Sequence, residues 1–103
     1  MNLRVAILYQ SKAPPALDGI VKPMKEGGYS DSGADIALAL VLNKVEVISP
    51  VDLPKTQNDF DWVFPDSLEG IETAISRGAN IFWLNTVLAA NELLKFCINC
   101  FSV

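Results

Sequence analysis

The residues with the clearest chemical potential lie in a glycine-rich turn early in the chain. Residues 27–33 read Gly-Gly-Tyr-Ser-Asp-Ser-Gly and lead into a segment of helical character. The first backbone amides of a helix, together with its dipole, favour an anion such as a phosphate or a carboxylate. A loop that ends in an ordinary cap, with Asp31 or Ser30 as the N-cap, explains the same residues equally well. The stretch matches neither G-x-G-x-x-G nor the P-loop pattern, so its signal for a nucleotide is weak.

Charged side chains of both signs surround this turn. Three lysines would attract an anion, although solvated surface lysines are the simpler interpretation: Lys12, Lys22 and Lys25. Four carboxylates would instead suit a substrate amine: Asp18, Glu26, Asp31 and Asp35. The sequence does not choose between these two classes of ligand.

The two cysteines, Cys97 and Cys100, have the spacing of a redox motif or of half a zinc site. The sequence has no second pair and no histidine, so the usual four-ligand zinc site cannot be completed. Apolar packing, or a tail without a role, is the interpretation that we adopt for this pair. The lack of histidine also removes the commonest general base. We therefore predict no catalytic residue and no metal site.

The elements that must position these residues alternate between strands and helices. The sequence predicts strands over 5–9, 45–48, 62–64 and 80–84, a helix over 31–42, and a second helix that ends before Gly78. Asp66 to Glu69 has the pattern of a capping box for that second helix. This alternation implies a parallel sheet. We expect an α/β, three-layer, Rossmann-like fold with a mainly parallel four-stranded sheet in the order 2-1-3-4 and helices on both faces.

Burial can also be predicted from the pattern of apolar residues. The helix over 31–42 is rich in them and is expected to be mostly buried, with Ser30, Asp31 or Ser32 as its cap. Trp62 and Trp83 lie in predicted strands and are expected in the core.

The loop after Tyr9 is the first candidate for a binding site. It runs for about twenty residues, whereas strand-to-helix connections usually take only a few, and long connections tend to be functional. In parallel sheets, ligands bind beyond the carboxyl ends of the strands. That edge is predicted to hold this loop, the stretch after Ile48, the Pro65-Asp66 turn and Asn85-Thr86.

Composition limits the classes of function. Twelve acidic residues against eight scattered basic ones give a formal charge of −4, which argues against nucleic acid and anionic membranes as partners. No apolar run approaches the roughly twenty residues that span a bilayer. We expect a soluble, cytoplasmic protein with one domain over 1–92 and an apolar C-terminal tail over 93–103.

Four segments taken together carry a family resemblance. They are the strand Arg4–Tyr9 with its long loop, the helix start Ser32–Ala37, the Trp62–Asp66 turn and the strand end Ile81–Thr86. In this order they resemble the Rossmann-like N-terminal domain of ATP-grasp ligases, which precedes the ATP-binding halves of enzymes such as D-alanine–D-alanine ligase. The resemblance covers roughly Arg4 to Thr86.

The resemblance implies a carboxylate–amine ligase, in which ATP phosphorylates a carboxylate and an amine attacks the acyl phosphate. It implies substrate contacts from Gln10 to Lys12 and from Ser30 to Gly33. The groups that hold ATP and magnesium belong to later domains of that family, so we expect a truncated N-terminal domain that is not catalytic and binds no cofactor alone; ATP and Mg are implied for a full-length relative. The expected substrate-binding residues are Gln10, Ser11, Lys12, Gly28, Tyr29, Ser30, Asp31, Ser32, Asn85 and Thr86.

Two other functions fit the same sequence. One is a free-standing, flavodoxin-like module, with a binding or regulatory role, that holds a small anion at Gly27 to Gly33. The other is an interaction domain that forms a homodimer through Leu93 to Phe101, because Phe96 to Phe101 is mainly apolar and would need cover.

Overall fold

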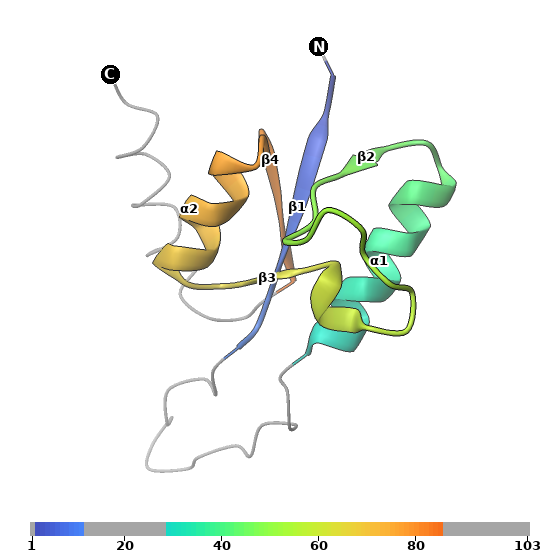
Figure 1. Cartoon of the computed structure of the whole chain (residues 1–103), viewed down its shortest axis with the longest axis horizontal. Coiled ribbons are helices and arrows are strands. Elements are labelled where there is room, and N and C mark those ends of the chain that lie inside the picture. The colour runs from blue at the N-terminus through green and yellow to red at the C-terminus, as the bar shows by residue number, and fades with distance from the viewer. Residues whose placement is uncertain (1, 12–28, 86–103) are drawn as a thin grey trace.

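The structure, a computed structural model, describes residues 2–11 and 29–85. Strands and helices alternate along the chain (Figure 1). They are β1 (Arg4–Tyr9), α1 (Ser30–Leu42), β2 (Glu46–Val47), the 3₁₀ turn η1 (Asp59–Asp61), β3 (Phe64–Pro65), α2 (Leu68–Ser76) and β4 (Ile81–Asn85). The predicted α/β class is confirmed, with most element boundaries displaced by one or two residues.

β1 is the central strand, because each of the other three strands pairs with it. β2 pairs with β1 at Arg4 and Val5, and β3 pairs with it at Leu8 and Tyr9. β4 runs beside β1 from Val5 to Tyr9. All of these pairings are parallel, as the alternation of elements predicts.

The observed pairing differs from the predicted order 2-1-3-4, because β4 lies against β1 and not against β3. The reason is the length of the strands. β3 has two residues and ends in Pro65, whose nitrogen cannot donate a hydrogen bond. β1 has six residues and offers a ladder long enough for all five residues of β4.

The core lies on both faces of β1. Ala6 and Leu8 pack toward α2, whereas Val5 and Ile7 pack toward α1, as expected when successive side chains of a strand point in opposite directions. All four side chains are buried. α1 and α2 therefore lie on opposite sides of β1 (Figure 1), which explains the continuous apolar run in this strand.

The fully buried residues of α1 are all small, and only Ile36 and Leu40 among its large apolar residues pack, partly buried, against the core, so the expectation that this helix is mostly buried is wrong. Its buried residues are Ser30, Gly33 and Ala37, which share one face at a spacing of three and four. Large apolar side chains elsewhere on the helix, such as Leu38 and Leu42, are exposed. Small residues at the contact let the helix backbone approach the sheet closely.

α2 begins and ends at recognisable caps. The N-cap is Ser67, whose Oγ accepts a hydrogen bond from the Gly70 N–H at 3.1 Å, so the cap lies one residue beyond Asp66. A Cβ on Gly70 would overlap the Pro65 carbonyl oxygen, which explains the glycine. Gly78 follows the helix with φ of 105°, which confirms the predicted C′ glycine.

The two tryptophans differ in burial. Trp62 packs partly buried against the α1-side core, and its Nε1 donates a hydrogen bond to the Lys55 carbonyl at 3.0 Å. Trp83 lies in β4 and is 46% exposed, so its expected place in the core is wrong. The reason is its strand: α1 packs over β1 and leaves this side chain of β4 open to solvent.

Candidate functional site

The candidate site lies at the carboxyl edge of the sheet. β1, β3 and β4 run parallel, so their carboxyl ends point the same way, and both α1 and α2 begin at this edge (Figure 1). Ligands of parallel sheets bind at such an edge. The polar side chains there come from segments far apart in the sequence.

The first polar contact joins the end of β1 to the turn after β3. The Asp66 carboxylate accepts two hydrogen bonds through Oδ1, from the Ser11 N–H at 3.0 Å and from the Ser11 hydroxyl at 2.7 Å. The Asp66 N–H donates to the Tyr9 carbonyl at 3.0 Å. Three hydrogen bonds thus fix the Asp66 turn against the residues that leave β1.

The second polar contact joins the start of α1 to the end of β4. The Asn85 side-chain amide donates to the Ser32 hydroxyl at 2.7 Å, and that hydroxyl donates to the Tyr29 carbonyl at 3.1 Å. The Tyr29 N–H donates to the Gln10 carbonyl at 3.3 Å. The start of α1 is therefore held by residues from both β1 and β4.

The start of α1 places a carboxylate beside its first backbone amides. Its N-cap is Tyr29, whose side chain makes no cap hydrogen bond. The Ser32 N–H donates to the Asp31 carboxylate at 2.9 Å, and Ser30 is buried. A phosphate at this helix end would meet the negative charge of Asp31 beside the amides that it needs.

Tyr9 lies next to the Asp66 turn and packs its ring against Phe60. The two ring centroids are 5.8 Å apart and the planes make an angle of 70°, an edge-to-face contact. Burial raises the pKa of the Tyr9 phenol, and the Asp66 carboxylate raises it further. Tyr9 therefore stays protonated near neutral pH and offers a hydroxyl rather than a base.

Most of the described cationic side chains lie toward the amino edge of the sheet, where Arg77 pairs with the Asp52 carboxylate at 2.7 Å. Three of the four described cationic side chains lie toward the amino edge: Arg4 begins β1, Lys44 follows α1 and Arg77 follows α2. The fourth lies in the loop between β2 and η1. At the carboxyl edge, the described charged residues next to the polar contacts are Asp31 and Asp66.

The structure describes seven of the ten predicted site residues. It brings Gln10 together with Tyr29, and Ser32 together with Asn85, at one edge. Ser11 lies at the same edge in contact with the β3–α2 turn. The other described members are buried Ser30 and partly exposed Asp31. The remaining three predicted residues, Lys12, Gly28 and Thr86, lie outside the described residues, as do Cys97, Cys100 and the predicted interaction segment Leu93–Phe101.

Asp66 and Tyr9 lie at this edge but are absent from the predicted site residues, although the Pro65-Asp66 turn is predicted to lie here. Tyr9 ends β1 and Asp66 directly follows β3. This position at a strand end is the sequence signal that could have placed both residues in the predicted site. The capping-box pattern assigned Asp66 to the start of α2, although Ser67 takes that role. The contact of Asp66 with Ser11 spans 55 residues of sequence and depends on the pairing of β3 with β1.

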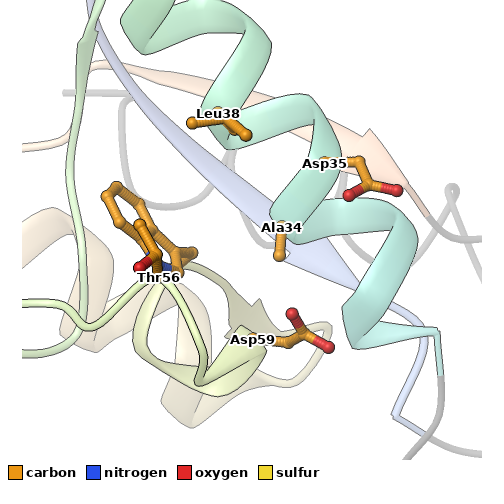
Figure 2. Close-up of a pocket in the computed structure, with 6 residues that line it drawn as sticks. Ala34, Asp35, Leu38, Thr56 and Asp59 are labelled. Atoms are coloured by element: carbon orange, nitrogen blue, oxygen red, sulfur yellow. The ribbon is translucent and has the colours of Figure 1, made fainter.

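A small pocket of about 70 Å³ lies beside this edge, between α1 and the segment that contains η1 (Figure 2). Figure 2 shows Ala34, Asp35 and Leu38 on the helix, with Thr56 and Asp59 on the facing segment. Trp62 supplies an aromatic wall. The charged groups of the lining are carboxylates, so this pocket does not suit a phosphate.

Comparisons of the chain with protein-family models, curated proteins and solved structures found no match. Residues 2–11 and 29–85 contain no group of three or more histidine, cysteine, aspartate or glutamate side chains that could hold a metal ion. Within the same residues, neither α1 nor α2 is long and apolar enough to cross a membrane.

Proposed function

We propose that this chain is a substrate-binding module, the Rossmann-like N-terminal domain of an ATP-grasp-type carboxylate–amine ligase. In such a ligase, other domains hold ATP and Mg²⁺, and this domain contacts a small-molecule substrate. The chain alone is then expected not to hydrolyse ATP.

One observation carries this proposal. The resemblance implies substrate contacts from Gln10 to Lys12 and from Ser30 to Gly33, and the described part of the first segment, Gln10–Ser11, lies at the carboxyl edge beside the start of α1. The hydrogen bond from Tyr29 to Gln10 joins them directly. Asn85, from the strand that closes the resemblance, contacts the same helix start through Ser32.

The chemistry of the edge supports a small polar substrate with both donors and acceptors. The hydroxyls of Ser11 and Ser32 donate to Asp66 and to the Tyr29 carbonyl, so they keep acceptor capacity for a ligand, and the amide of Asn85 and the Asp31 and Asp66 carboxylates lie beside them. An amino acid carries complementary groups. A free-standing module for a small anion is the competing proposal, and the two carboxylates weigh against it.

A titration of the ¹⁵N-labelled chain tests the proposal. Amide signals are followed on addition of amino acids, ATP with Mg²⁺, or inorganic phosphate. We expect amino acids to shift the amides of Ser11, Tyr29, Ser32 and Asn85, while Lys44 at the opposite edge serves as an internal control. Shifts at this edge with phosphate alone would favour the anion-binding module, and no shift with any probe would contradict both proposals.

ATP hydrolysis provides a second measurement. We expect the purified chain to release no phosphate from ATP above the buffer background. Turnover that persists after a further purification step would contradict the proposal that this chain is a substrate-binding module without catalysis of its own.

A further inference from the structure

Asp66 connects the turn after β3 to the residues that leave β1. Its N–H donates to the Tyr9 carbonyl at 3.0 Å, which extends the parallel pairing of β1 and β3 by one residue. Its carboxylate then accepts both the N–H and the hydroxyl of Ser11, at 3.0 and 2.7 Å. The side chain thus supplies an acceptor at the point where the described strand pairing ends.

Helix capping does not explain this carboxylate. Ser67 is the N-cap of α2, and its hydroxyl oxygen accepts the Gly70 N–H. Asp66 lies before that cap, and its Oδ1 is directed across the edge to Ser11. Hydrogen bonds to a charged acceptor are stronger than those between neutral groups, so an aspartate holds Ser11 more firmly than an asparagine or a serine would.

Ser11 occupies a decisive place at the candidate site. Its neighbour Gln10 accepts the hydrogen bond from Tyr29 that joins β1 to the start of α1. The hydrogen bonds that hold Ser11 therefore also hold the residues that directly follow β1 at the carboxyl edge. We propose that Asp66 is a positioning residue of the substrate site, which acts through Ser11: it takes both donors of Ser11, the N–H and the O–H, and so fixes the hydroxyl oxygen as an acceptor for a small polar substrate. The substrate part of this inference rests on the proposed function.

Amide hydrogen exchange measured without ligand tests whether the hydrogen bonds from Ser11 to Asp66 fix the position of Ser11. The variants are Asp66→Ala and Asp66→Asn, with Glu69→Gln as the matched control, because Glu69 is an exposed acid nearby, in the first turn of α2. We expect Asp66→Ala to lower the protection of the Ser11 amide by about tenfold relative to that of Leu8, and Asp66→Asn to lower it less. Glu69→Gln should leave it unchanged. Unchanged protection of the Ser11 amide in Asp66→Ala would overturn the inference. If Asp66→Ala does not fold, the protection of the same amide in Asp66→Asn decides the question.

Binding affinity tests whether this hold matters to a substrate. For an amino acid that shifts the wild-type amides, we expect Asp66→Asn and Ser11→Ala each to weaken binding by about tenfold, and the double variant to be no weaker than Ser11→Ala. Ser11→Thr should restore affinity, because it restores the hydroxyl. Wild-type affinity in Asp66→Asn would overturn the inference while the proposed function stands. If no amino acid shifts the wild-type signals, the proposed function fails and the exchange experiment still decides whether Asp66 holds Ser11.

Discussion

Gly70→Ala is the substitution for which the structure makes the sharpest stability prediction. Gly70 lies in the first turn of α2, where a Cβ would overlap the Pro65 carbonyl oxygen and lie 3.0 Å from Pro65 Cγ. The obstructing oxygen belongs to the backbone, so no side-chain rotation can relieve the contact. The start of α2 must move away from β3 instead.

Two opposing effects set the change in the free energy of unfolding that we expect for Gly70→Ala. Alanine gains at most about 1 kcal/mol over glycine from its higher helix propensity. Forcing extra atoms into a packed position costs about 1–3 kcal/mol, and a rigid backbone neighbour places Gly70→Ala at the upper end. We expect a net loss of about 2 kcal/mol in the free energy of unfolding, and a fall in Tm of about 10 °C for a chain of this size.

Urea unfolding followed by circular dichroism measures this loss, and Gly33→Ala is the matched control. A Cβ on Gly33 would lie 2.8 Å from Val63 Cγ1, which belongs to a side chain. The double variant Gly33→Ala with Val63→Ala should therefore be more stable than the sum of its single losses predicts, whereas no side-chain truncation should rescue Gly70→Ala. Wild-type or higher stability of Gly70→Ala would refute the close contact of α2 with β3.

Three further outcomes follow from single contacts. Ser67→Ala should cost about 1 kcal/mol of stability in urea because α2 loses its cap, while Ser76→Ala should stay within about 0.5 kcal/mol; equal losses would contradict the assigned cap. Burial and a nearby carboxylate raise the pKa of Tyr9 above its unfolded value, so wild-type stability should fall as pH rises above about 10, and should fall less in Tyr9→Phe; identical pH profiles would count against the shift. A double-mutant cycle on Ser32 and Asn85 should give a coupling of about 0.5–1 kcal/mol, and a value of zero would contradict their hydrogen bond.

The sequence predicts those parts of the fold that depend on local signals. The apolar run of β1 indicates a strand that is covered on both faces, and Gly78 marks the end of α2 because its positive φ favours glycine. Strand pairing was less predictable. β4 pairs with β1 because β3 is short. A strand of two residues that ends in Pro65 shows too little hydrophobic pattern for its length and pairing to be predicted.

Burial of α1 could not be predicted from its apolar content, because the helix has large apolar residues on most sides. The structure buries the face with Ser30, Gly33 and Ala37, which an analysis of hydrophobicity passes over. A helix that packs closely on a sheet needs small side chains at the contact. The sequence of the helix alone does not show which of its faces will meet the sheet.

The sequence by itself determined the α/β class and the parallel sheet, because both follow from the order of strands and helices. Only the tertiary structure decided which side chains meet at the carboxyl edge of that sheet. Ser11 reaches Asp66 across 55 residues and Ser32 reaches Asn85 across 53. Such contacts depend on which strands pair and in which register, and the two residues of β3 are too few for their hydrophobic pattern to specify a register.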